Sequence, residues 1–228
     1  MNEISFNCPS PKYVFLGEKV LDLGSGLGVD SFIAGAAVGA SGSVTGLDIS
    51  RGEVTHANKR VEVRGVQNVN FVHGDMEQMP FETESFDAVI SNGAFCLAPN
   101  KEAAFKEIYR VLKPGGRFSV ACTTVKADLD KDVNWPICMR VFMPLQEARP
   151  MLGGIGFNNI NVDDSDSKMT FEELNLDDTI QYENKEIENG NKDQNGRQRI
   201  HVGSAEFQHL ENYDMNKLCA RVILCGQK

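Results

Sequence analysis

The chain has 228 residues, of which 41% are hydrophobic, enough for the core of one α/β domain and too many for a chain that is disordered throughout. Its formal net charge of −9 at pH 7 argues against a nucleic-acid partner, whose phosphates a binding protein must neutralise, and favours a small or cationic ligand. We expect a cytoplasmic protein without a membrane span, because the first residues lack a signal-peptide pattern and no run approaches the ~18 apolar residues that a span needs.

Six cysteines are scattered along the chain: Cys8, Cys96, Cys122, Cys138, Cys219 and Cys225. They form no C-x-x-C pair, so neither a zinc site nor a disulfide framework is indicated. Most of them should therefore serve as small buried apolar residues.

The first clear pattern is a short apolar strand at 20–23 that runs into three glycines at alternate positions, Gly24, Gly26 and Gly28. Glycines let the backbone turn sharply and approach a ligand closely, and a helix after them would point its N-terminal amides into the same crevice. That helix should end near 39–42, and apolar residues recur in it at helical spacing: Val29, Phe32, Ile33, Ala36 and Ala37. A plain tight turn has the same glycine pattern, so the residues around it must decide its role.

Strands and helices alternate through the next part of the chain. We expect strands at 43–48, 68–73, 86–92 and 117–122, and helices at 53–64 and 101–112. The turn at 113–116 should stop the second of these helices. The alternation predicts an α/β fold with a doubly wound, mostly parallel sheet of seven strands, whose ligands bind at the carboxyl ends of the strands.

The pattern weakens after residue 123. Prolines in 135–156 predict broken helical pieces, and strands should follow at 157–162 and 218–224. Residues 163–195 are acidic and rich in asparagine, the composition of a mobile excursion. We therefore expect a single domain made of an N-terminal segment (1–18), a ligand-binding core (19–163), an acidic, partly flexible insertion (164–216) and the last strand of the sheet (217–228).

Several parts of the sequence together resemble the class I S-adenosylmethionine-dependent methyltransferases, over about residues 17–122. These parts are the strand and glycine turn at 20–28, Asp48, the turn at 74–76, the strand at 87–92 and the turn at 112–116. A nicotinamide-binding turn, the rival interpretation, spaces its last two glycines further apart. The resemblance implies a Rossmann-like fold, S-adenosylmethionine as the cofactor, and methyl transfer to a small-molecule acceptor by in-line displacement.

The resemblance also implies roles for residues near the methionine end of the cofactor. Asp22, exposed amides of Gly24 and Gly26, and a carbonyl near Ser91 and Asn92 would bind this zwitterion. Because the cofactor carries no phosphate, no P-loop lysine is required. The other implied contacts in this part of the sequence are Ser25 and Gly28.

At the nucleoside end, the resemblance makes Asp48 the carboxylate that accepts hydrogen bonds from the ribose. Asp75 would accept from the adenine amino group while Met76 packs beside the ring. From the residues alone, Asp48 also suits a plain strand-end acid and Asp75 a turn former, and Asp87 is expected to support the fold. The other implied contacts here are Ile49 and Gly74.

Two further segments resemble the arsenite methyltransferase subgroup. Residues 5–11 place Cys8, and residues 135–138 place Cys138, on arsenic-binding cysteines of that subgroup. Thiolates are soft ligands that suit As(III) and leave its lone pair free to attack a methyl group. Where the subgroup carries S-N-C, this chain has Gly93 in place of the cysteine, and Cys96 is the nearest thiol. The resemblance thus nominates Cys8, Cys96 and Cys138 as catalytic residues.

Other interpretations remain open at this point. Cys8 also suits an exposed thiol and Cys138 a core residue. The quinone, sterol and tocopherol C-methyltransferases share the core motifs, and an organic acceptor would call for a base such as His73. A third interpretation is a non-catalytic cofactor-binding module whose acidic excursion at 163–195 contacts a partner. The sequence does not indicate an oligomeric state.

Overall fold

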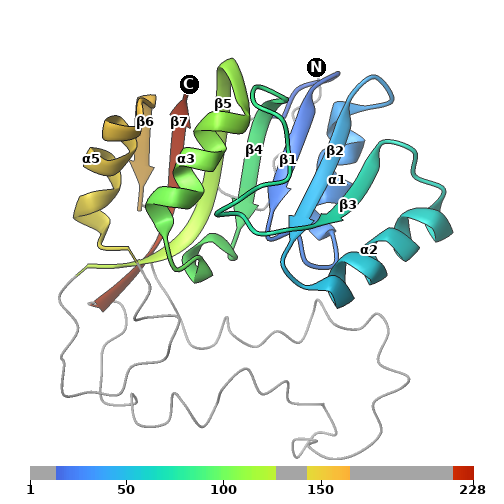
Figure 1. Cartoon of the computed structure of the whole chain (residues 1–228), viewed down its shortest axis with the longest axis horizontal. Coiled ribbons are helices and arrows are strands. Elements are labelled where there is room, and N and C mark those ends of the chain that lie inside the picture. The colour runs from blue at the N-terminus through green and yellow to red at the C-terminus, as the bar shows by residue number, and fades with distance from the viewer. Residues whose placement is uncertain (1–13, 127–142, 165–217) are drawn as a thin grey trace, which may run out of the picture.

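The computed structural model describes residues 14–126, 143–164 and 218–228, which form one seven-stranded sheet with helices on both faces (Figure 1). In chain order the elements are β1 (Lys19–Leu23), α1 (Val29–Val38), β2 (Ser43–Asp48), α2 (Arg51–Arg64), β3 (Val69–His73), β4 (Phe86–Asn92), the short 3-10 helix η1 (Phe95–Leu97), α3 (Lys101–Val111), β5 (Leu112–Val125), α5 (Leu145–Ile155), β6 (Asn158–Asp163) and β7 (Cys219–Gln227).

The strand order is β3-β2-β1-β4-β5-β7-β6. The first five strands in this order pair in parallel, whereas β7 lies antiparallel between β5 and β6. The direction of winding reverses between β1 and β4, which are neighbours in the sheet although β2 and β3 separate them in sequence. Ligands of such sheets bind beside the carboxyl ends of the strands at this reversal. The predicted fold class is confirmed.

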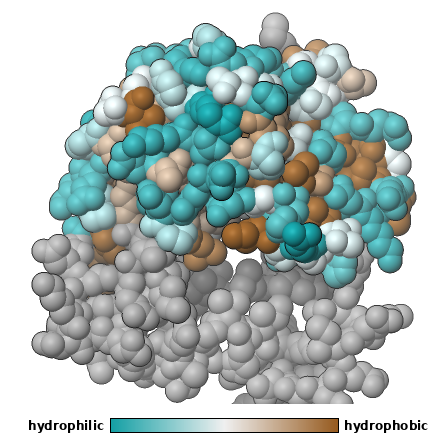
Figure 2. Space-filling model, viewed as in Figure 1, coloured by the Kyte–Doolittle hydropathy of each residue, from teal (hydrophilic) through white to brown (hydrophobic). Residues whose placement is uncertain are grey.

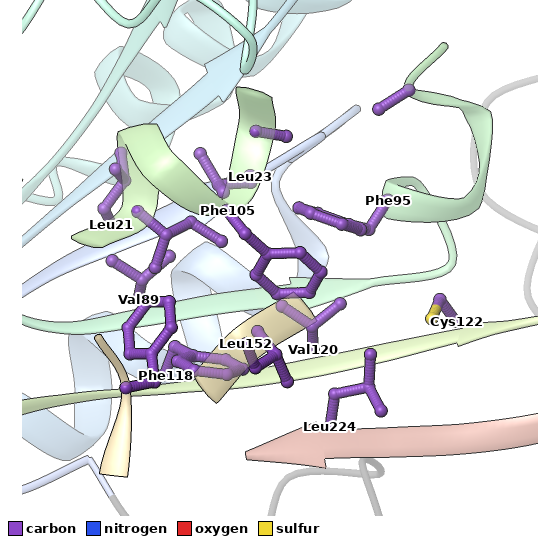
Figure 3. Close-up of a cluster of buried hydrophobic side chains, with 14 of the residues drawn as sticks. Leu21, Leu23, Val89, Phe95, Phe105, Phe118, Val120, Cys122, Leu152 and Leu224 are labelled. Atoms are coloured by element: carbon purple, nitrogen blue, oxygen red, sulfur yellow. The ribbon is translucent and has the colours of Figure 1, made fainter. Parts of the chain in front are cut away.

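Successive residues of β1 point to opposite faces of the sheet and into two separate cores. Val20 packs with residues of α1 and α2, whereas Leu21 and Leu23 pack with residues of α3 and α5. In the second core the Phe105 ring lies 4.4 Å from that of Phe95 and 5.5 Å from that of Phe118, measured between ring centroids (Figure 3). These buried side chains fix the positions of β1 and β4, the two strands between which the strand order reverses.

Helix α1 lies where we expected it and ends just before Gly39, but its buried face is not the one on which its apolar residues recur. The residues that it buries are Ser31, Ala34, Gly35 and Val38. Of the recurring apolar residues, Val29 is 52% exposed, whereas Phe32 is partly buried against the core. The helix lies so close to the sheet that a Cβ atom at Gly35 would overlap the Val69 side chain. Only small residues fit under it, so the bulkier apolar residues occupy its flanks.

Helix α3 ends at Val111, just before the expected stop, and the turn at 113–116 falls within the bounds of β5. Phe86 pairs with Leu112 and Ala88 with Arg117, so these four residues bulge out opposite Asp87. The Asp87 carboxylate accepts hydrogen bonds from Lys113 Nζ at 2.6 Å and from the Lys19 amide at 2.8 Å. Burial raises the pKa of Asp87, but these hydrogen bonds outweigh it and hold the pKa below its ordinary value. Asp87 thus supports the fold, as expected.

The strands predicted near 157–162 and 218–224 are present as β6 and β7, and α5 forms around Pro150. The pieces expected at 135–142 and the insertion at 164–216 fall, except for Asp164, outside the described residues. Among the helices of the described ranges, none combines the length and hydrophobicity that crossing a membrane requires.

Candidate functional site

The glycine turn after β1 is tightly packed on both sides. Gly24, Gly26 and Gly28 all have φ between +51° and +86°, a region that side-chain-bearing residues rarely adopt. A Cβ atom at Gly24 would overlap Ala94, and one at Gly28 would overlap the Phe71 ring. The turn therefore has one conformation, set by its neighbours from β3 and from the loop after β4.

The expectation of exposed amides at Gly24 and Gly26 was wrong. The Gly24 amide donates to the Leu47 carbonyl at 2.8 Å, and the Gly26 amide donates to Asp48 Oδ2 at 2.9 Å. The amide of Ser25 also donates to Leu47, at 3.1 Å. Backbone amides must be paired when they are buried, and here β2 supplies the acceptors. The turn is bound to the carboxyl end of β2 rather than left open to donate to a ligand.

Asp48 lies at the end of β2, 9% exposed, and both of its oxygens accept backbone hydrogen bonds. Besides the Gly26 amide on Oδ2, the Ser50 amide donates to Oδ1 at 2.8 Å. A carboxylate has about four acceptor sites, so each oxygen can still accept from a ligand hydroxyl. The next residue, Ile49, is 71% exposed and offers an apolar side chain beside this carboxylate.

Asp22 is buried at 2% exposure and faces the first turn of α1. Its Oδ2 accepts a hydrogen bond from Ser31 Oγ at 2.6 Å. The pKa of Asp22 is raised to about 7, chiefly by burial; the hydrogen bonds from Ser31 work against this rise, and the nearby carboxylates of Asp30 and Asp48 add to it. Asp22 thus ties β1 to the helix, and its expected contact with a ligand stays a prediction.

Four carboxylates surround the glycine turn: Asp22, Asp30, Asp48 and Glu53. Burial raises the pKa of Glu53 and the charge on Asp48 raises it further. Within the described ranges, the ion pairs of the structure involve none of these four acids. A cation bound here would therefore relieve their mutual repulsion.

Sequence reasoning missed Asp30, Ser31 and Glu53 as members of this site. For Glu53 a signal exists, because Ser50 and Glu53 form the S-x-x-E pattern of a helix start, and the Ser50 side chain accepts from the Glu53 amide at 3.3 Å. Ser31 and Asp30 lie in the first turn of α1 and carry no motif of their own. Only the packing of α1 onto β1 reveals their proximity to Asp22.

The end of β4 closes the site on its other side. Ser91 Oγ donates to the Leu23 carbonyl at 2.8 Å, and Asn92 Nδ2 donates to Asp30 Oδ2 at 3.2 Å. Gly93 follows with φ +75°, and no described atom lies within 4 Å of the position that its Cβ would occupy. The structure thus leaves open space beside Gly93, at the point where the strand order reverses.

The predicted turn after β3 lies beside the same glycine turn. The Gly74 amide donates to the Asp48 carbonyl at 3.0 Å, which holds the turn against β2. Asp75 is exposed, and its side chain accepts a hydrogen bond from the Glu77 amide at 2.8 Å. This hydrogen bond stabilises the turn, while the carboxylate stays accessible from solvent. Met76 is partly buried, and its Cε lies 3.8 Å from the position of a Cβ at Gly24.

Ser25 carries the one buried side-chain nitrogen or oxygen atom of the described residues that has no hydrogen-bond partner. An unpaired buried hydroxyl costs stability, so this atom is a candidate for a hydrogen bond with a bound ligand. Together with the four acids, the open space at Gly93 and the apolar Ile49, it fits a ligand that combines positive charge, hydroxyl groups and an apolar ring. S-adenosylmethionine has these features.

The structure places one of the three nominated cysteines. Cys96 lies in η1, 7% exposed, and its Sγ donates to the Gly93 carbonyl at 3.2 Å. Cys8 and Cys138 lie outside the described residues. Within the described ranges no group of three or more potential metal-ligating side chains is present. His73 lies exposed at the end of β3, next to Asp48 in the sheet.

Apolar side chains are exposed near the carboxyl ends of the strands. Leu27 and Val29 flank the end of the glycine turn, Ile49 follows β2, and Leu97 follows β4, with exposures between 46% and 71%. Hydrophobic residues also reach the lower part of the described surface in Figure 2, where the parallel strands end. This rim makes the edge suitable for a ligand with an apolar part.

A family model described as a methyltransferase domain matches residues 16–139, which is more than half of the chain. Among curated proteins, the chain is 33% identical over 177 residues to an arsenite methyltransferase of Halobacterium salinarum, covering 74% of this chain and 45% of that protein. It is 40% identical over 117 residues to a cycloartenol-C-24-methyltransferase of Arabidopsis thaliana, covering 50% of this chain and 34% of that protein. The chain thus spans less than half the length of these relatives.

Among solved structures, the fold resembles an arsenic(III) S-adenosylmethionine methyltransferase from Chlamydomonas reinhardtii, with a TM-score of 0.63 at 23% identity. The likeness covers 99% of this chain and 67% of that one. At this identity it supports the fold.

Proposed function

Because this chain belongs to the methyltransferase domain family, we propose that it binds S-adenosylmethionine at the carboxyl edge of the sheet and transfers the methyl group to a small-molecule acceptor. The observation that carries the proposal is the group of four carboxylates around the glycine turn, Asp22, Asp30, Asp48 and Glu53, which lack ion pairs among the described residues. The cofactor has a positively charged sulfur and an ammonium group, which such a group of acids attracts.

When bound, S-adenosylmethionine supplies a methyl group that a nucleophile can displace from the sulfonium. The acids around the turn hold the positively charged end, and the Ser25 hydroxyl offers a buried hydrogen-bond donor. Asp48 retains acceptor capacity for ribose hydroxyls, while Ile49 and Met76 offer apolar contacts to the adenine ring. By fixing the cofactor, these residues align the methyl carbon with the acceptor, which is the main work of such an enzyme.

The proposed cofactor site can be tested by comparing the affinity of the chain for S-adenosylmethionine with its affinity for the product. S-adenosylhomocysteine lacks the positive charge on sulfur, so titration calorimetry should show several-fold weaker binding of the product than of the cofactor. Glu53→Gln should narrow this ratio, because one of the acids loses its charge. Glu102→Gln is the matched control, since Glu102 is exposed on α3 and pairs with Lys106. No binding of S-adenosylmethionine to the wild-type chain would overturn the proposal.

We further propose arsenite as the acceptor, bound by the thiolates of Cys8, Cys96 and Cys138. The similarity to the Halobacterium salinarum protein supports this choice, as does the location of Cys96 directly after β4, three residues beyond Gly93. Incubation with arsenite, glutathione and S-adenosylmethionine should yield methylated arsenic. Cys138→Ser should reduce the yield strongly, and Cys225→Ser, which removes a buried thiol from β7, should not. Unchanged methylation by the Cys138 variant would rule out this thiolate mechanism.

An organic acceptor is the second candidate, because the chain is similar to a sterol methyltransferase and its exposed Leu27, Val29 and Leu97 form an apolar rim. Methylation of a sterol or quinone, with no methylated arsenic, would favour it. Here His73→Gln should lower the rate if this residue acts as the base. Cofactor binding without transfer to any of these acceptors would instead indicate a non-catalytic module.

A further inference from the structure

The connection between β3 and β4 is held in place by side chains of α3. Residues 74–85 form this connection, and in Figure 1 they run from β3 towards α3 before β4 begins. They include a turn at 75–78, in which the Gln78 amide donates to the Asp75 carbonyl at 3.2 Å. The next residue, Met79, is 5% exposed and belongs to the larger hydrophobic core. The turn is therefore short and joined directly to a buried residue.

Glu107 and Arg110 of α3 bind both backbone groups of Met79. The Met79 amide donates to Glu107 Oε2 at 2.7 Å, and the Met79 carbonyl accepts from Arg110 Nη2 at 3.1 Å. Arg110 Nη1 also donates to the Phe81 carbonyl at 2.7 Å. Backbone groups outside helices and strands need such partners, and here two helical side chains supply what a neighbouring strand supplies in a sheet.

The two side chains also bind each other. Arg110 Nε lies 2.6 Å from Glu107 Oε1, and Arg110 Nη2 lies 2.8 Å from Glu107 Oε2, a two-bond contact that fixes both groups. The hydrogen bonding with Arg110 lowers the pKa of Glu107, burial opposes the change, and the Met79 amide lowers the pKa further. The carboxylate thus stays ionised at neutral pH and keeps its capacity to accept from the Met79 amide.

The start of α3 is attached to the same turn. Glu77 Oε1 accepts from the Asn100 amide at 2.7 Å, at the N-terminus of this helix. The Glu77 amide in turn donates to Asp75 Oδ1 at 2.8 Å. Contacts with α3 therefore hold the turn on both sides of Gln78, and one of them continues directly to the Asp75 carboxylate.

We propose that Glu107 and Arg110 are positioning residues for cofactor recognition, which hold the turn at 75–78 so that Asp75 faces the adenine amino group. This inference rests on the proposed function, from which it takes the cofactor. Both residues lie on α3, outside the motifs that resemble the family, and they act through the backbone of Met79 and Phe81. A displacement of the turn by about 1 Å is enough to misalign its contact with the base.

Recognition of the adenine amino group can be measured with two ligands that differ at that position. S-adenosylhomocysteine carries the amino group, whereas S-inosylhomocysteine carries a carbonyl oxygen that the Asp75 carboxylate would repel. Titration calorimetry of the wild-type chain should show roughly tenfold tighter binding of the adenosyl ligand, the effect of one hydrogen bond to a charged group. Arg110→Met should bring this ratio near unity, because the turn loses the hydrogen bonds at Met79 and Phe81.

The same helix provides a matched control. Lys106→Met removes a positive charge whose ion pair, with Glu102, does not involve the turn, so this variant should keep the wild-type ratio. Arg110→Lys keeps the charge but cannot replace the planar set of donors, so its ratio should lie between those of the wild type and Arg110→Met. It also tests the inference if Arg110→Met does not fold. A variant that is merely less stable would bind with reduced stoichiometry and an unchanged ratio.

A double variant identifies the route by which Arg110 acts. Asp75→Asn alone should lower the ratio, and the addition of Arg110→Met should then lower it little further, because both changes disrupt the same contact. Independent effects, which multiply in the double variant, would show that Arg110 does not act through Asp75 and would overturn the inference.

The outcomes separate this inference from the proposed function. A wild-type ratio in folded Arg110→Met and Arg110→Lys overturns the inference and leaves the proposed function intact. The same holds if the wild-type chain binds S-adenosylmethionine but does not distinguish the adenosyl from the inosyl ligand. A wild-type chain that binds none of these ligands overturns the proposed function and this inference with it. Thermal unfolding midpoints establish that each variant is folded.

Discussion

The Ser31 hydroxyl donates a 2.6 Å hydrogen bond to the Asp22 carboxylate, and this contact joins the central strand β1 to the first turn of α1. Asp22 is thereby held beside the N-terminus of a helix, where the backbone dipole favours negative charge. Burial nevertheless dominates and raises the pKa of Asp22 to about 7. The carboxyl group consequently changes its charge near neutral pH in the protein without ligand.

We expect Asp22 to make the stability of the ligand-free protein depend on pH. Its pKa rises from 3.8 in the unfolded chain to about 7 in the folded one, so the folded state holds this proton more tightly. The resulting stabilisation is fully present below pH 3.8, decreases as pH rises and is lost above pH 7. Asp22→Asn should therefore raise the unfolding midpoint at pH 8 and change it much less at pH 5. Each unit of difference between the folded and unfolded pKa corresponds to about 1.4 kcal/mol of stability.

Thermal unfolding at pH 5, 6.5 and 8 measures this difference. Asn can still accept from Ser31, so the variant isolates the charge. An unfolding midpoint at pH 8 that is lower in the variant than in the wild type would contradict the assignment.

Cofactor affinity should rise with pH over the same range. The ionised Asp22 attracts the positively charged end of S-adenosylmethionine, and the protonated form does not. Calorimetric titrations between pH 6 and 8 should show binding that strengthens severalfold, and Asp22→Asn should remove most of this dependence. Glu102→Gln, which removes a surface charge on α3, should retain the wild-type slope. A wild-type affinity that is independent of pH would show that the ligand does not sense Asp22.

Much of the fold could be predicted because the strands are short apolar runs that end in turns. The turn signals at Gly39 and near Lys113 located two helix ends correctly. The inward face of α1 could not be found in the same way. Hydrophobic periodicity favours large side chains, whereas this face selects small ones because α1 lies close to Val69.

Site residues that belong to a sequence motif could be predicted. Contacts that depend on how distant segments pack could not. Asp48 and Asn92 border the site because they lie at strand ends, a position that the sequence reveals. The amides of Gly24 and Gly26 were misjudged because their acceptors come from β2, about 20 residues further along the chain. Long-range hydrogen bonds of this kind depend on strand register, which no local pattern contains.

Gly24→Ala should destabilise the protein and weaken cofactor binding together. The new Cβ would overlap Ala94, and an L residue at φ +69° costs about 1–2 kcal/mol in addition. Gly65→Ala is the control, because Gly65 has φ +64° but no atom within 4 Å of the Cβ position, so it carries the backbone cost alone. Denaturant unfolding should show a larger loss for Gly24→Ala.

The double variant Gly24→Ala/Ala94→Gly separates the two costs. Removing the Ala94 methyl group relieves the overlap but not the backbone strain, so the double variant should recover part of the lost stability. If the double variant is no more stable than Gly24→Ala alone, the overlap with Ala94 contributes little to the loss of stability.

Arg117→Lys should lower stability without changing cofactor affinity. The Arg117 guanidinium donates to both carboxylate oxygens of Glu18, at 2.8 and 2.7 Å, and its Cζ lies 4.5 Å from the centroid of the Phe15 ring. Lysine cannot form this two-bond contact or stack in the same way, so we expect a loss of about 1–2 kcal/mol. Glu18 precedes β1 and Arg117 pairs near the start of β4, so both lie at the sheet edge opposite the glycine turn. Urea unfolding and calorimetry of the same preparation test both halves of the prediction, and a weakened affinity at unchanged stability would contradict it.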